Sequence, residues 1–242
     1  CIHDGFGVIK FREALTGPEY AYRYIRKAIE AGVTILPETM VMNLSSDRVV
    51  TVASRREYRT INAGAVVLAM GCRERTRGAL GIPGARPAGV FTAGVVQHLV
   101  NLQNIMVGRK MVILGSGDIG LIMARRLTLE GAKIEAVVEK LPYPSGLPRN
   151  ITQCLEDYDI PLLLKHTVTR IWGKRRLEAV TISRLNDFGE PVRSSARKVP
   201  CDTLILSVGL IPENELALGA GVKLDEMTGG PIVDEHLQTS VP

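Results

Sequence analysis

The residues best suited to chemistry form a glycine-rich turn near the middle of the chain. This turn follows a short apolar run at 110–114 and opens a stretch with helical spacing. Glycines in a G-x-G-x-x-G pattern allow a sharp turn, close approach of the backbone to a pyrophosphate, and tight packing of helix on strand. The helix N-terminus adds free N–H groups and the positive end of its dipole. We therefore predict a dinucleotide site formed by Gly115, Ser116, Gly117, Asp118, Ile119 and Gly120.

The elements around this turn are those that a βαβ unit requires. Apolar residues recur at helical spacing from Ile119 to Leu127, and a second apolar strand, 132–138, ends at Glu139. A carboxylate about 20 residues after the turn can accept hydrogen bonds from an adenosine ribose and would repel a 2′-phosphate. The next residue is Lys140 and no arginine cluster follows, so NAD is favoured over NADP. The alternative is a tight βα turn without a ligand.

Composition excludes several classes of protein. The 242 residues are 45% hydrophobic and 23% charged, which is typical of a globular chain and not of a disordered one. No apolar run reaches the roughly 18 residues of a membrane span. The net charge of +5 is spread over scattered basic residues and only 5% of residues are aromatic, so a nucleic-acid-binding protein is disfavoured. Four well-separated cysteines without a histidine pair predict no metal site and a cytoplasmic location.

A second feature is a duplicated pattern. An apolar strand, a meander of alternating segments and a closing β-run occupy residues 160–209, and residues 33–71 repeat this plan. Each copy ends at a glycine, Gly209 or Gly71, where the backbone can approach a ligand. In the second copy the glycine turn lies well upstream of Gly209. By analogy, we expect the turn of the first copy to lie upstream of Cys1.

With both patterns in place, the sequence resembles the pyridine nucleotide-disulfide oxidoreductase superfamily of two-dinucleotide flavoproteins. Residues 69–71, Ala-Met-Gly, resemble the Ala-Thr-Gly turn that this family places beside the flavin nucleotide, with Met70 in place of threonine. Residues 231–242 resemble the stretch before the family's second flavin motif. The resemblance implies that FAD contacts Val41, Ala69 and Gly71, and that Gly209 borders the nicotinamide half of NAD.

Three further stretches resemble one branch of the superfamily. They are residues 1–7, 15–20, and 71–75 continuing to 91–94. This branch includes amine- and opine-oxidising flavoproteins and the protein associated with bacterial glycerol-3-phosphate dehydrogenase. The redox C-x-x-C or C-x4-C pair of the disulfide reductases is missing from the sequence, so disulfide reductase activity is not expected.

Together these observations predict an α/β fold with two Rossmann-like lobes and β-meander additions. Residues 1–103 and 213–242 would form an incomplete FAD lobe, and residues 104–212 an NAD lobe. The resemblance implies electron passage between NAD(H) and FAD and then to a small-molecule substrate or a partner electron-transfer subunit. No catalytic side chain is expected, because this transfer depends on positioning of the two cofactors. The alternative is a non-catalytic nucleotide-binding component of a larger complex, and a homo-oligomer is left open.

Overall fold

The computed structural model describes residues 6–241, and the chain divides into two compact units. Unit 1 comprises Cys1–Cys72 and Pro212–Pro242, and unit 2 comprises Arg73–Ile211. The chain crosses between the units at β4 (Cys72–Glu74) and at β13 (Leu210–Pro212), and these two strands pair with each other. We expected a boundary at 103/104, but the units divide at 72/73. The reason is that β5 and α4, within residues 73–103, pair with and pack on the sheet of unit 2.

Unit 2 is built on a five-stranded parallel sheet, in agreement with the α/β class predicted from the sequence. The strand order is β5-β12-β6-β7-β8, and every pair is parallel. Strands on both sides of β6 are reached by crossovers, so the direction of winding reverses between β6 and β12. Ligands of such sheets bind in the crevice at the carboxyl ends of the strands at this point. The strands are β5 (Val90–Thr92), β6 (Lys110–Leu114), β7 (Lys133–Val138), β8 (Leu162–Leu163) and β12 (Thr203–Leu206).

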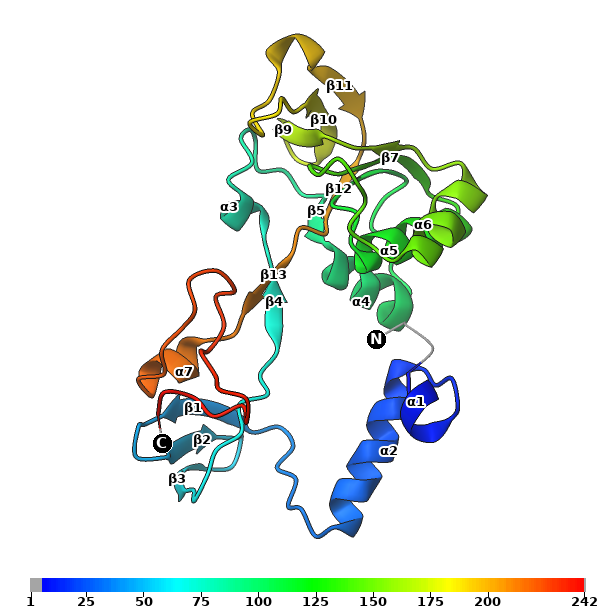
Figure 1. Ribbon diagram of the computed structural model, residues 1–242. Helices are drawn as coiled ribbons and strands as arrows, with labels where there is room; N and C mark the ends of the chain where they lie inside the picture. Colours follow the sequence, from blue (N-terminus) through cyan, green and yellow to red (C-terminus); the bar gives the residue numbers. More distant parts are fainter. Residues whose placement is uncertain (1–5, 242) are drawn as a thin grey trace. The chain divides into compact units, whose positions relative to one another are not determined.

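Two buried clusters cover the two faces of this sheet. Met111 and Ile113 of β6 face the helices, whereas Val112 and Leu114 face a β-meander. Such alternation follows from the two-residue period of a strand. Figure 1 shows the three resulting layers of unit 2, with the sheet between the helices and the meander. The helical layer comprises α4 (Ala93–Gln103), α5 (Asp118–Leu129), α6 (Pro148–Cys154) and η1 (Glu156–Tyr158).

The meander agrees with its sequence prediction. Strands β9 (His166–Gly173), β10 (Leu177–Arg184) and β11 (Arg197–Pro200) form an antiparallel sheet in the order β11-β10-β9. A turn at 186–190, with the turn-forming composition Asn-Asp-Phe-Gly-Glu, follows β10, and the Asn186 side chain accepts hydrogen bonds from the N–H groups of Phe188 and Glu190. The short helices η2 (Arg193–Ser195) and α3 (Arg77–Leu80) complete unit 2.

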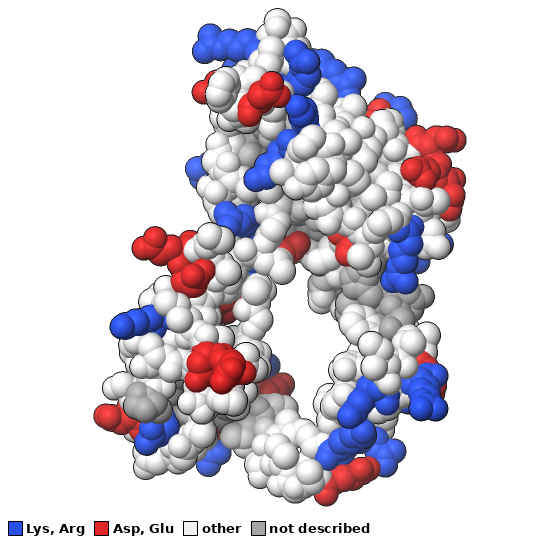
Figure 2. Space-filling view, in the orientation of Figure 1, with Lys and Arg blue, Asp and Glu red and all other residues white. Residues whose placement is uncertain are grey.

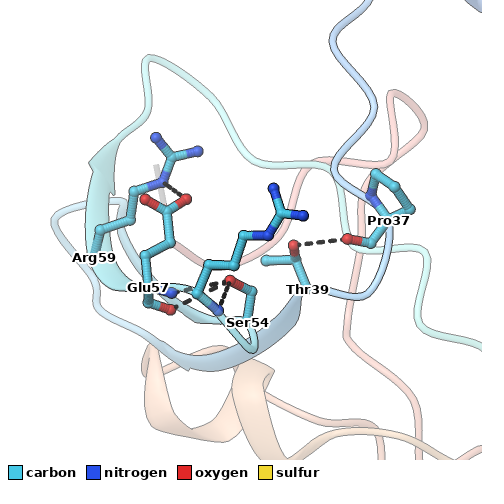
Figure 3. Close-up of polar contacts among 6 residues, drawn as sticks. Pro37, Thr39, Ser54, Glu57 and Arg59 are labelled. Atoms are coloured by element: carbon cyan, nitrogen blue, oxygen red, sulfur yellow. Dashed lines mark hydrogen bonds and ion pairs between the residues drawn. The ribbon is translucent and has the colours of Figure 1, made fainter.

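The described residues of unit 1 form a second three-stranded antiparallel sheet and three helices. The strands are β1 (Met40–Leu44), β2 (Val49–Ala53) and β3 (Tyr58–Asn62), in the order β1-β2-β3. Around the β2–β3 turn, the Ser54 hydroxyl accepts hydrogen bonds from the N–H groups of Arg56 and Glu57, and Glu57 pairs with Arg59 (Figure 3). The helices are α1 (Val8–Phe11), α2 (Gly17–Glu30) and α7 (Glu215–Gly219).

Helix α2 begins as its sequence prescribes. The Thr16 hydroxyl accepts a hydrogen bond from the Glu19 N–H, while the Glu19 carboxylate accepts from the Thr16 N–H at 2.8 Å, and Pro18 occupies the first turn. These contacts form a capping box. Hydrogen bonds from Thr16 hold the pKa of the Glu19 carboxyl below its usual value.

Two strands expected in unit 1 are not formed. Residues 33–36 and 65–71 have no strand conformation, and Val67 is 90% exposed. An isolated segment cannot form a strand, because strand geometry depends on hydrogen bonds to a neighbour. Neither segment has such a neighbour among residues 6–241. Each copy of the duplicated pattern therefore contains its own antiparallel three-stranded sheet, but only the second copy has a closing strand, β12.

The cysteines differ in accessibility, which predicts a labelling pattern. Cys154 and Cys201 are buried in the core of unit 2, and burial raises the pKa of the Cys201 thiol to about 12. Cys72 is exposed. Because the thiolate is the reactive species, iodoacetamide at pH 8 should modify Cys72 and spare the two buried thiols. Peptide mass spectrometry checks this, and modification in denaturant is the positive control. Labelling of Cys201 in the native protein would contradict the packing of β12 on the meander.

Candidate functional site

The glycine turn lies where β6 and β12 end side by side. Gly115 has a φ of +101°, and a Cβ added there would lie 2.0 Å from the carbonyl oxygen of Ser207, immediately after β12. A Cβ at Gly120 would lie 2.9 Å from both the Gly115 carbonyl oxygen and the Ser207 Cβ. The fold itself thus requires glycine at the first and third positions, for the turn and for packing of α5.

Gly117 is different from its two neighbours. It precedes α5 with an ordinary extended conformation, φ −66° and ψ 161°, and no side chain caps the helix. The nearest atom to an added Cβ is Ser207 Oγ, at 4.0 Å. Neither strain nor packing therefore demands glycine here. The open space lies at the N-terminus of a 12-residue helix, where backbone N–H groups attract anions.

Glu139 lies beneath the turn and is only 5% exposed. Its Oε2 accepts hydrogen bonds from the Ser116 N–H at 3.0 Å and the Ser116 hydroxyl at 2.6 Å. Its Oε1 accepts from the Leu141 N–H at 3.0 Å. The carboxylate thus joins the end of β7 to the glycine turn and to the loop that follows. Since each carboxylate oxygen has two lone pairs, Oε1 can still accept one more donor.

The loop between β7 and α6 is attached to the same turn from the other side. Asp118 Oδ1 accepts hydrogen bonds from the Leu147 N–H and from the Asn150 amide, each at 2.8 Å. The Ser145 N–H donates to the Ser116 hydroxyl at 2.9 Å. Residues 116 and 118 of the turn therefore hold this loop at two points. This arrangement fixes one wall of the site.

Two cavities of unit 2 meet at this turn. The larger, of about 700 Å³, is lined by the strand-end residues Gly115, Glu139, Lys140 and Gly209 and by Thr167 and Thr169 of β9. The smaller, of about 160 Å³, is lined by Gly117, Asp118, Ile119, Ser207, Gly209 and Glu74. Ser207 and Gly209 border both cavities. Six of the eight residues predicted for the NAD site line one cavity or the other. Gly120 lies in the helix packing, and Ser116 is fully buried beneath the turn.

Glu74 belongs to a charge run, residues 73–75, whose composition favours a solvated surface over pairing with a phosphate or another domain. In the structure its carboxylate oxygens accept the Gly94 N–H at 2.9 and 3.0 Å, at the start of α4. A carboxylate at this place is favourable for the helix dipole. The spacing of 20 residues between Glu74 and Gly94 carries no local signal for such a contact.

The three FAD-contact residues expected by resemblance belong to unit 1. Val41 of β1 and Met70 line an apolar cavity of about 380 Å³ together with Leu44 and Val67. Ala69 and Gly71 are exposed and do not line this cavity. Gly71 has a φ of +72° and nothing within 4 Å of an added Cβ, so its backbone is open to close approach. The structure thus brings Val41 near residue 70, but does not gather all three side chains.

Sequence reasoning missed several residues of the site in unit 2. Ser207, Ser145 and Asn150 contact the turn, yet none belongs to a motif with a recognisable spacing. The proline- and glycine-rich composition of 142–148 indicates a loop but not its hydrogen bonds. Residues 6–241 contain no cluster of histidine, cysteine or acidic side chains that could hold a metal ion. Cys1 and His3 lie outside the described residues.

Comparison with known proteins identifies the fold and the family of this chain. The structure resembles the crystal structure of T. acidophilum thioredoxin reductase with a TM-score of 0.75 at 22% identity, covering 99% of this chain and 73% of that one. The fold is therefore the one found in FAD- and NAD-dependent oxidoreductases. The family model described as pyridine nucleotide-disulphide oxidoreductase matches residues 8–242. The chain belongs to this family, whose members use FAD and NAD(P)H.

Two curated relatives are similar over most of this chain. The NAD(P)H sulfur oxidoreductase (CoA-dependent) of Pyrococcus abyssi is 33% identical over 168 residues, which are 66% of this chain and 34% of the relative. An opine oxidase subunit of Agrobacterium tumefaciens is 28% identical over 198 residues, which are 77% of this chain and 38% of the relative. The chain thus spans about a third of the length of these relatives. Among residues 6–241, no helix has the length and apolar composition needed to cross a bilayer.

Proposed function

We propose that unit 2 binds NAD(H) and acts in an oxidoreductase that passes electrons between NAD(H) and FAD. The observation that carries this proposal is Gly117. Of the three glycines in the turn, the outer two are required by packing, whereas Gly117 faces open space at a helix N-terminus. A glycine that the fold does not need is well suited to a ligand whose phosphates must come close to the backbone.

The residues present fit a bound dinucleotide. The N–H groups at the start of α5 would hold the pyrophosphate, and Gly115, Ser116, Ile119 and Gly120 shape that end of the site. Glu139 Oε1 has room for one ribose hydroxyl, and a negative charge there would disfavour the 2′-phosphate of NADP. Gly209 would border the nicotinamide half. When bound, the dinucleotide supplies the hydride, and the chain's own residues orient it and exclude water.

The finer assignments rest on the relatives. Val41, Ala69 and Gly71 would contact the adenosine part of FAD, by resemblance to the family. Oxidation of an opine as the source of electrons is supported by the similarity to the opine oxidase subunit. Oxidation of an amine or of glycerol 3-phosphate, or electron transfer to a partner protein, is proposed by resemblance to the family. A cytoplasmic location is proposed from the four well-separated cysteines of the sequence.

Replacing Gly117 by alanine tests the nucleotide site directly. The added methyl group meets nothing in the protein, so the unfolding free energy should change by less than about 1 kcal/mol. At the same time NADH affinity should fall by at least about tenfold, because the methyl would stand between the backbone and a phosphate. Calorimetric titration with NADH and thermal unfolding measure the two effects.

A matched control is Gly64→Ala, since Gly64 also has open space around an added Cβ but lies in unit 1. That variant should leave NADH binding unchanged. If Gly117→Ala bound NADH as tightly as the parent protein, the turn would not be the phosphate site. NADH binding without reduction of any acceptor by a flavin-loaded protein would instead favour a non-catalytic nucleotide-binding component.

A further inference from the structure

The β-meander of unit 2 carries an excess of positive charge. Residues 166–200, which form the meander, hold eight lysines and arginines against three acidic residues. The remainder of the chain holds 22 basic and 22 acidic residues in total. Figure 2 shows Lys and Arg side chains around the end of unit 2 that carries β9, β10 and β11. A local excess of this size creates a positive field at that surface.

The outer face of the meander arranges two of these charges around one ring. Thr181 of β10 pairs with Arg170 of β9 on one side and with Lys198 of β11 on the other, so the three residues form a row across the sheet. Trp172 lies over this row, and its indole N–H donates to the Thr181 hydroxyl at 2.8 Å. The Arg170 guanidinium carbon lies 4.2 Å from the ring centre and Lys198 Nζ lies 4.8 Å from it.

These two cations have no acidic partner within the part of the chain that the structure describes. Other basic side chains of unit 2 do form ion pairs, including Arg126 with Glu130 and Lys165 with Asp187. Arg170 and Lys198 are both exposed and are held only by the indole ring. Like charges gathered on neighbouring strands disfavour each other unless an anion lies between them. The face is thus preorganised for a negative group that the chain itself does not provide.

We infer that this face, formed by Arg170, Trp172, Thr181 and Lys198, docks an acidic surface of a partner protein. Carboxylates of the partner would approach Arg170 and Lys198, while the half-buried Trp172 keeps the two cations extended and adds contact area. Aromatic and arginine side chains are enriched in protein interfaces, and complementary charge accelerates encounter. This proposal does not depend on the nucleotide site, because the outer face contributes no residue to the glycine turn.

Two other anionic partners fit the face less well. A nucleic acid would need a free aromatic surface for its bases, and Trp172, the single tryptophan of the chain, is already in contact with two cations. A lipid surface would need an apolar anchor beside the cations. The large apolar side chain exposed in the meander is Phe188, and it stands between the acidic residues Asp187 and Glu190, which anionic lipids would repel.

The experiment uses the whole chain and poly-L-glutamate as the probe, with binding followed by the fluorescence of Trp172. We expect saturable binding that weakens as salt is raised. The double variant Arg170→Glu with Lys198→Glu should reduce the affinity at least about tenfold. The control double variant, Arg55→Glu with Arg56→Glu, makes the same charge change in the exposed β2–β3 turn and should leave the affinity within about twofold. NADH titration and circular dichroism of all variants verify that the fold and the nucleotide site are retained.

Four outcomes would overturn the proposal. Poly-L-glutamate could fail to bind, or both double variants could weaken binding equally, which would show a non-specific charge effect. Tighter binding of a single-stranded oligonucleotide or of phosphatidylserine vesicles at equal charge concentration would assign the face to another class of partner. Finally, cations on edge strands also prevent sheet-to-sheet aggregation. Aggregation of the Arg170/Lys198 variant without a change in affinity would assign the residues to that role.

Discussion

Gly115→Ala is expected to unfold unit 2 under conditions in which the parent protein is folded. A Cβ at this position would lie 2.0 Å from the Ser207 carbonyl oxygen and 2.6 Å from its carbon, at a φ of +101°. The backbone atoms of β6 and β12 cannot move apart without breaking the centre of the sheet. Strain at such a conformation alone costs roughly 1–3 kcal/mol, and with the steric clash we expect a loss of about 4 kcal/mol or more. Urea unfolding followed by circular dichroism measures this loss.

Gly131→Ala separates the two contributions. Gly131 also has a positive φ, +84°, but an added Cβ there meets nothing within 4 Å. Its replacement should therefore cost only about 1 kcal/mol, the conformational contribution by itself. Equal losses in the two variants would show that the close approach of Gly115 to Ser207 is not a determinant of the fold.

Glu139→Ala is the second substitution with a large expected effect. It leaves the Ser116 N–H, the Ser116 hydroxyl and the Leu141 N–H without their acceptor in a buried place. Unsatisfied buried donors cost about 1–3 kcal/mol each before relaxation, and we expect a net loss of about 3 kcal/mol. The glycine turn and the loop after β7 would no longer be joined, so NADH affinity should fall about tenfold or more.

The same variant tests the preference for NAD. Removal of the carboxylate should narrow the difference in affinity between NADH and NADPH, because the charge that opposes a 2′-phosphate is lost. Calorimetric titrations with both nucleotides measure this difference, and Glu226→Ala, at an exposed position, is the control. An unchanged ratio together with weaker binding of both nucleotides would leave Glu139 the role of holding the loop, without contact to the ribose.

The sequence predicted unit 2 well because its elements are determined locally. Strand β6 was predicted with its observed bounds, and α5 ends two residues after Leu127, the last apolar residue of the predicted helical spacing. The helical period of the apolar residues, the spacing of the glycines and the acidic residue at the end of the second strand can all be recognised within about 30 residues. The three-stranded meander and the five-residue turn at 186–190 follow from alternation and turn composition in the same way.

Contacts between distant segments could not be predicted. The Ser207 carbonyl beside Gly115, the Glu74 carboxylate at α4 and the Asp118 contacts to the loop at 147–150 depend on how separate elements pack. In unit 1 the apolar runs 33–36 and 65–71 have strand composition but lack a neighbour in the described chain. Composition specifies a tendency to form a strand, whereas a strand is formed only by pairing.

The position of β12 in the sheet determines when unit 2 can fold. This strand lies between β5 and β6, so neither of those earlier strands can gain its central partner until residues 203–206 have been synthesised. Asp202, just before β12, accepts hydrogen bonds from the Arg109 and Lys110 N–H groups and so joins segments more than 90 residues apart. Such non-local pairing makes folding slow and leaves nascent strand edges exposed. During synthesis on the ribosome, β5 and β6 would remain unpaired with β12 until almost the whole of unit 2 has emerged. A chaperone would protect their exposed edges during this interval.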